Sequence, residues 1–74
     1  MSIHGISVHL CSGNFGFQVK NDRDEKVSVV VDYHSKDGSF ASKRFDLDAK
    51  SAEIYHIDIP LKSVRIAGYF VPNT

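Results

Sequence analysis

The sequence lacks most of the residues that small proteins use as covalent staples or anchors. Among its 74 residues there is no tryptophan and only one cysteine, Cys11. A single cysteine excludes a disulfide within the chain, so the composition favours a reducing compartment and we expect a cytoplasmic protein. No basic segment precedes an apolar one at the start, and no run approaches the ~20 apolar residues that span a bilayer. The sequence therefore predicts neither a signal peptide nor association with a membrane.

Formal charge is missing from the first nineteen residues, MSIHGISVHLCSGNFGFQV. The nine acidic and nine basic residues all follow that segment, and the net charge is zero. This balance argues against a nucleic-acid binder, whose affinity rests on cationic neutralisation of phosphates. It also leaves little repulsion between copies, which favours a homo-oligomer. Burying charge is costly, so a segment without charge is suited to being covered. We therefore expect the charge-free segment 3–10 to pair with another chain.

Helical periodicity is absent as well, because apolar residues recur at every second position. The predicted strands cover residues 6–10, 15–19, 26–34, 40–47, 52–59 and 63–71. Val27, Val29, Val31 and Tyr33 form one face of the third strand and are predicted to lie in the core. Six short strands separated by turns predict an all-β, single-domain antiparallel β-sandwich, or a partly open barrel, spanning 1–74.

Two stretches refine this fold. Residues 48–57, DAKSAEIYHI, have a helical alternative, but their β-branched and aromatic content favours a strand. Gly68, inside the last strand, is predicted to mark a bulge or a close backbone approach. FQVKNDRDEKVSVVVDY and LDAKSAEIYHIDIP resemble segments of immunoglobulin-type sandwich domains, where a polar loop precedes a Val-rich strand and a capped turn precedes an alternating one. The resemblance implies a fold and carries no activity.

Histidine and aspartate alternate on two of the predicted strands. Asp32 and His34 share one face of the third strand, and His56 and Asp58 share one face of the fifth. If those strands were neighbours, two imidazoles and two carboxylates would converge on a Zn²⁺ or Ni²⁺ site of a ligand- or metal-binding sensory domain. Ordinary cross-strand polar pairing explains the same pattern. The sequence therefore predicts no cofactor and leaves this quartet as an alternative.

No arrangement of residues in the sequence matches a catalytic site. Cys11 lies at a predicted hairpin turn without the setting of an activated nucleophile, and GNFGF at 13–17 lacks the lysine of a phosphate-binding loop. A domain this small rarely encloses a substrate pocket of ~300 Å³ or more. We predict that the protein is not an enzyme and that Cys11 packs at a turn.

Aromatic residues near basic ones provide a second alternative, a weak single-stranded nucleic-acid binder. In oligonucleotide-binding barrels, bases stack on exposed aromatic rings beside cationic side chains. The residues concerned are Tyr33, Phe40, Lys43, Arg44, Tyr55 and Tyr69. The competing interpretation is that most of these rings fill the core, which a chain this short requires.

The predicted strands also carry apolar, aromatic and arginine residues out of phase with the core, a mixture enriched at interface hot spots. The candidate partner-binding residues are Ser7, His9, Val30, Phe40, Arg44, Ile54, Arg65 and Tyr69. The sequence thus predicts a small non-catalytic protein-interaction module that occludes or joins a partner protein, as an inhibitor or accessory subunit does. In size and style, though in no motif, it is similar to small phage-encoded inhibitors of bacterial defence such as anti-CRISPR proteins.

Overall fold

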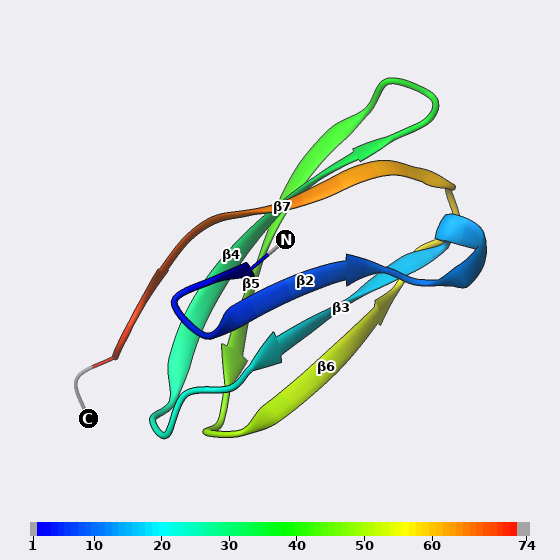
Figure 1. Cartoon of the computed structure of the whole chain (residues 1–74). Coiled ribbons are helices and arrows are strands. Elements are labelled where there is room, and N and C mark those ends of the chain that lie inside the picture. Colours follow the sequence, from blue (N-terminus) through cyan, green and yellow to red (C-terminus); the bar gives the residue numbers. More distant parts are fainter. Residues whose placement is uncertain (1, 73–74) are drawn as a thin grey trace.

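Residues 2–72 are described by a computed structural model in which seven strands form two antiparallel sheets (Figure 1). The four-stranded sheet has the order β1 (Ser2–Ile3), β2 (Ile6–Leu10), β3 (Gly16–Asn21) and β6 (Ser51–His56). The three-stranded sheet has the order β5 (Phe40–Leu47), β4 (Val27–Ser35) and β7 (Leu61–Phe70). One 3₁₀ turn, η1 (Ser12–Asn14), joins β2 to β3. The predicted all-β antiparallel sandwich is confirmed.

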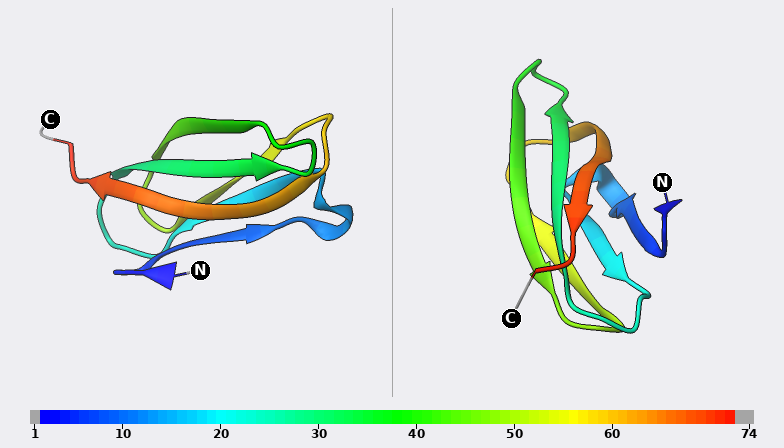
Figure 2. Two further views of the ribbon diagram at one scale, coloured as in Figure 1. Left: turned by 90° about the horizontal axis from the view of Figure 1, so that it is seen from above. Right: turned by 90° about the vertical axis from the view of Figure 1, so that its left-hand side faces the viewer.

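The two sheets pack face to face as the two layers of a sandwich (Figure 2). Hairpins connect β2 to β3 and β4 to β5 within a sheet, whereas the chain changes sheet between β3 and β4, β5 and β6, and β6 and β7. The stretch with a helical alternative contains the strand β6, and within residues 2–72 no helix is long and apolar enough to cross a bilayer.

The core fills the space between the inner faces of the sheets. Val27, Val29 and Val31 of β4 are completely buried, as the alternation predicts. Phe17 of β3 is also fully buried, and its ring centroid lies 5.5–5.6 Å from those of Tyr33, Phe45 and Tyr55. Burying each large apolar side chain contributes about 1.5–3 kcal/mol. The aromatic cluster joins strands of both sheets and therefore forms part of the core that holds the layers together.

The N-terminal strand β1 was not predicted, because two residues give no alternation to detect. His4 and Gly5 both have positive φ, 49° and 83°, as a two-residue type I′ hairpin requires. The turn sets Ser2 opposite Ser7 and Ile3 opposite Ile6. Ile6 and Ser7 thus have an edge partner within the same chain, and the pairing of segment 3–10 with another chain stays a prediction.

A bulge interrupts the pairing of β7 with β4. Val31 lies opposite Ile66 and Val30 opposite Gly68, which leaves Ala67 with no opposite residue on β4. The bulge predicted at Gly68 is therefore confirmed. An extra residue exchanges the faces of all that follow it, because side chains alternate along a strand. Tyr69 consequently turns toward the inner side and Phe70 toward the outer side.

Asn21, at the end of β3, connects the four-stranded sheet to the turn that follows β5. Its side chain is completely buried. The amide Nδ2 donates to the backbone oxygens of Glu25 at 2.9 Å, Asp48 at 3.0 Å and Leu47 at 3.4 Å. Its Oδ1 accepts from the Arg23 backbone N–H at 2.9 Å. One side chain therefore ties the end of β3 to the β3–β4 loop and to the end of β5.

Candidate interaction surface

The outer side chains of β4, β5 and β7 form one continuous surface, the three-stranded face. The register aligns them in rows across the sheet, with Val30 between Arg44 and Gly68, and Asp32 between Ser42 and Arg65. The face comprises Ser28, Val30, Asp32, His34, Phe40, Ser42, Arg44, Asp46, Ser63, Arg65, Gly68 and Phe70. Four of the predicted partner-binding residues, Val30, Phe40, Arg44 and Arg65, therefore share this surface.

Two carboxylates lie inside a hydrogen-bond network on the three-stranded face. Asp32, only 7% exposed, accepts from Ser42 Oγ at 2.6 Å and from Arg65 Nη2 at 3.3 Å. The hydrogen bond from Ser42 is the main cause that lowers the pKa of Asp32 below its ordinary value, and the hydrogen bond and positive charge of Arg65 lower it further. Asp32 is therefore ionised at neutral pH, while the side chain of Arg65 remains 65% exposed.

Asp46 is held in the same way by Ser28, from its own row, and by Arg44, from the next row. It accepts from Ser28 Oγ at 2.6 Å and from Arg44 Nε at 3.1 Å. The hydrogen bond from Ser28, and then the one from Arg44, lower the pKa of Asp46. The Arg44 side chain is 58% exposed and contacts Asp46 through its Nε.

Two exposed phenylalanines lie at opposite ends of this face. Phe40, 57% exposed, is opposite His34 near the end of β4, and the two ring centroids are 4.8 Å apart. Phe70, 47% exposed, is opposite Ser28 at the start of β4, and the Arg44 guanidinium lies 5.4 Å from its ring centroid. Phe70 was missed because it is in phase with the core until the bulge is counted. Gly68 was the signal that could have found it.

Ser7, His9 and Ile54 lie on the opposite side of the molecule, on the outer face of the four-stranded sheet. His9, Gln18 and Ile54 form one row across β2, β3 and β6, and Ser7, Lys20 and Ala52 form the next. Ile54 is 53% exposed, and Lys20 is the only formally charged residue in these two rows. The predicted partner-binding residues therefore divide between two faces instead of forming one.

Tyr69 belongs to neither outer face, which corrects the prediction that it points outward. The bulge brings it opposite Val29 on the inner side, where it is half-buried against the core. Its hydroxyl is 2.7 Å from His4 Nδ1, and the Arg23 guanidinium lies 5.7 Å from its ring centroid. Tyr69 thus packs the last strand against the N-terminal hairpin.

The structure does not bring the His/Asp quartet together. Asp32 and His34 lie on β4 of the three-stranded sheet, whereas His56 ends β6 of the four-stranded sheet and Asp58 follows it. In residues 2–72 no three His, Cys, Asp or Glu side chains are grouped so that they could hold a metal ion. The reason is topological, because β4 has β5 and β7 as its neighbours.

Most of the rings proposed for base stacking point inward. Tyr33 is only 9% exposed, and burial is the main cause that raises the pKa of its hydroxyl. Tyr55 packs beside Phe17 and Phe45, and Lys43 Nζ covers this group at 5.1 Å from the Tyr55 ring centroid. Among the four candidate rings, Phe40 alone is exposed.

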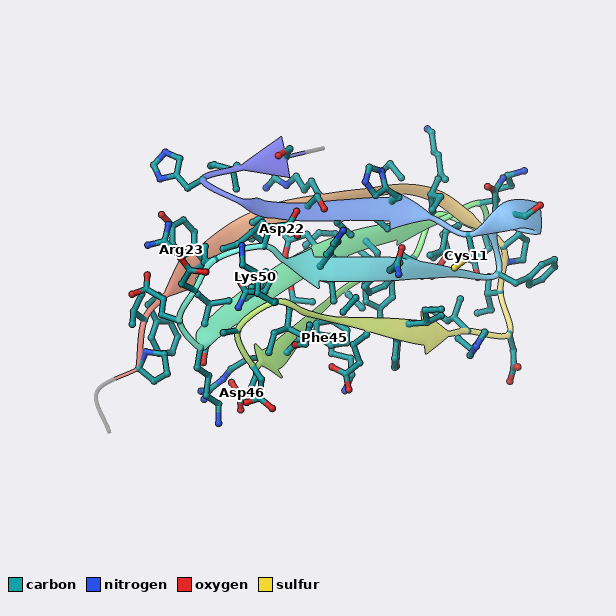
Figure 3. All side chains as sticks on the ribbon, turned by 60° about the horizontal axis from the view of Figure 1, so that its bottom comes forward. Cys11, Asp22, Arg23, Phe45, Asp46 and Lys50 are labelled. Carbon is teal, nitrogen blue, oxygen red and sulfur yellow. The ribbon has the colours of Figure 1, made fainter. Side chains whose placement is uncertain are left out.

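Cys11 is half-buried where β2 leads into η1. Its N–H donates to the Gly16 carbonyl at 3.0 Å, and its carbonyl accepts from the Asn14 N–H at 2.9 Å, so its backbone closes the turn. Figure 3 shows Cys11 at the opposite end of the sheet from the charged loop residues Asp22, Arg23 and Lys50.

Comparison with models of protein families, with curated proteins and with solved structures found no significant match to this chain. The surfaces described above are therefore what supports an assignment of function.

Proposed function

We propose that the protein is a non-catalytic interaction module that binds another protein through the three-stranded face. The observation that carries this proposal is the pair of exposed phenylalanines, Phe40 and Phe70, set on one face with Arg44 and Arg65. Aromatic residues and arginine are the types most enriched at interfaces and their hot spots. Bound there, the protein acts as an inhibitor or an accessory subunit.

The order of this face supports the proposal. Hot-spot side chains contribute most when they are held in place before binding, because less conformational entropy is then lost. Phe40 rests on His34, Arg44 is fixed by Asp46 and covers Phe70, and Arg65 is fixed by Asp32. Each anchor thus has a neighbour on the face that restricts its rotamers.

The two alternatives receive less support. A metal-binding sensory site needs the His/Asp quartet in one place, and the quartet is divided between two sheets. Single-strand binding needs several exposed rings in sequence along a cationic groove, and Tyr33, Tyr55 and Tyr69 are buried or half-buried.

The test is affinity capture from the source cells with tagged wild type and with the Phe40→Ser and Phe70→Ser variants, followed by titration of the captured protein in purified form. We expect wild type to retain a partner and each variant to lose affinity by about tenfold or more, the 1.4 kcal/mol or more of a hot-spot side chain. The matched control is Phe15→Ser, which removes a phenylalanine of similar exposure, 51%, from the β2–β3 connection.

Equal binding by wild type and both face variants would overturn the proposal. So would an equal loss of binding in Phe15→Ser, because binding would then depend on exposed apolar area of any kind. Circular dichroism of each variant establishes that the sheets are intact. A purified single-stranded oligonucleotide, titrated alongside, tests the nucleic-acid alternative directly.

A further inference from the structure

The edges of the two sheets differ in how they are protected against pairing with another chain. Edge strands are commonly blunted by shortness, by charged residues and lysine above all, by proline or by a bulge. β1 has two residues, β5 carries Lys43 and Arg44, and β7 carries Lys62, Arg65 and a bulge. β6, with the sequence SAEIYH, has six residues with no lysine, proline or bulge among them, and its one charged side chain is that of Glu53, opposite Val19. Figure 3 shows β6 as the outer strand of the four-stranded sheet.

The pairing of β6 with β3 determines which backbone groups face its open side. The Ile57 N–H donates to the Phe15 carbonyl at 3.1 Å, one step beyond the pair of Gly16 and His56. Hydrogen-bonded and non-hydrogen-bonded pairs alternate along an antiparallel ladder. Tyr55 and Glu53 therefore bond to β3, and the N–H and C=O groups of Ala52, Ile54 and His56 point away from it. Ile54, in the middle, also has a side chain that is 53% exposed.

We propose that β6 is a homodimerisation edge, at which the β6 strands of two copies pair antiparallel about a two-fold axis through Ile54. The two four-stranded sheets then form one continuous sheet. Ile54 lies opposite the partner's Ile54 and exchanges both backbone hydrogen bonds with it, while Ala52 and His56 exchange theirs with the partner's His56 and the partner's Ala52. Every outward backbone group of the strand is thereby satisfied.

The side chains make this register self-complementary. With the axis at Ile54, the two isoleucines meet on the outer face, and Glu53 lies opposite the partner's Tyr55 on the other face. An axis at Glu53 would set two carboxylates directly opposite each other, which is destabilising. A two-fold axis that passes between Glu53 and Ile54 would place outer-face side chains opposite inner-face ones. A second copy fits because a two-fold interface presents the same patch twice, and the chain's zero net charge adds little repulsion.

The proposal is independent of partner binding on the three-stranded face, and its first test is sedimentation velocity over a concentration series. We expect wild type to dimerise and Ile54→Lys to raise the dissociation constant at least about tenfold, because two ammonium groups would then face each other. His9→Lys is the control, since it adds the same charge to the same face two strands away and is expected to dimerise like wild type.

Amide hydrogen exchange of the wild type supplies a second test that needs no variant. The amides of Ala52, Ile54 and His56 should become protected as the protein concentration rises, whereas those of Glu53 and Tyr55 are protected at every concentration. A wild type that stays monomeric to about 1 mM would overturn the proposal. So would exchange at Ile54 that does not change with concentration, or dimers weakened equally by His9→Lys.

Discussion

The two sheets share one core but differ in what they present to solvent. On the three-stranded sheet, hydrogen bonds and ring contacts link nearly all the outward side chains, and Ser28 and Asp32 of the middle strand β4 are 1% and 7% exposed. On the four-stranded sheet, the rows through His9 and Ser7 contain small or neutral polar residues apart from Lys20, with Ile54 exposed at the edge. One sheet offers an ordered face, and the other an open edge.

This difference explains the charge-free start of the chain. The charge-free segment contains β1, β2 and most of β3 of the four-stranded sheet, and serine, histidine and glutamine serve there as the polar residues of the outer rows. The charged pairs are concentrated where they fix side chains, on the three-stranded face and in the loop around Arg23, whose pKa is raised chiefly by its hydrogen bond to Glu25. The ion pairs found within residues 2–72 thus lie on the three-stranded face and around this loop.

The first prediction tests whether the sheets depend on one core. Phe17→Ala removes the ring that contacts Tyr33, Phe45 and Tyr55, and should lower the free energy of unfolding by about 3–5 kcal/mol. Phe15→Ala, two residues away and half exposed, should cost less than about 1 kcal/mol. Urea denaturation measures both. Two separate transitions in the Phe17 variant would mean that the sheets are held independently.

The second prediction tests the two faces of β4 against each other. Val31→Ala removes buried methyl groups and should cost about 1–3 kcal/mol, whereas Val30→Thr on the three-stranded face should cost clearly less. Thermal and urea denaturation compare the two. If Val30→Thr were the more damaging change, the three-stranded face would carry stability in place of binding.

The alternation in β4 made this face assignment predictable from sequence. Four apolar residues at every second position, from Val27 to Tyr33, leave no other phase that buries them. The same rule failed in β7, because the residue opposite Val30 depends on a bulge whose position the alternation does not fix. Counting through Gly68 without the bulge sends Tyr69 outward and Phe70 inward, the reverse of what is found.

The sequence predicted which types of residue form the candidate surfaces, but not which of these residues lie on the same face. Arg44, Arg65 and Phe40 were recognised as interface-like, yet the sequence does not say which strands are neighbours, so Ile54 could not be separated from them. The hairpin formed by β1 and the contacts of Asn21 also could not be predicted from the sequence. A two-residue strand has no periodicity, and a buried asparagine differs from a loop asparagine only through partners distant in sequence.

The third prediction concerns the junction between the sheets. Asn21→Ala removes the donor that serves the carbonyls of Leu47 and Asp48, and should cost about 1–2 kcal/mol. The effect stays below that of a deep cavity because water reaches part of the loop and replaces some of the lost bonds. Gln18→Ala on the same strand faces outward and is the control. Equal losses in both would mean that strand propensity, not the junction, sets the cost.

The smallest effect is expected in the acid stability of the three-stranded face. Hydrogen bonds from Ser42 and Ser28, with help from Arg65 and Arg44, lower the pKa values of Asp32 and Asp46 in the folded state below the roughly 3.9 of an unfolded aspartate. The folded protein therefore binds fewer protons than the unfolded chain near that pH, so this contribution is complete above about pH 4–5 and is lost as the pH falls through the folded pKa values. Urea denaturation between about pH 6 and 2.5 should show a free energy of unfolding that declines below about pH 4.

Asp32→Asn should flatten that decline, and Ser42→Ala should flatten it in part. Ser63→Ala, whose hydroxyl lies beside His34 and not beside Asp32, should leave it unchanged. A decline that Asp32→Asn and Ser42→Ala do not alter would place the acid-sensitive carboxylates outside this face, and the ordering of Arg65 by Asp32 would then contribute nothing to the stability of the fold.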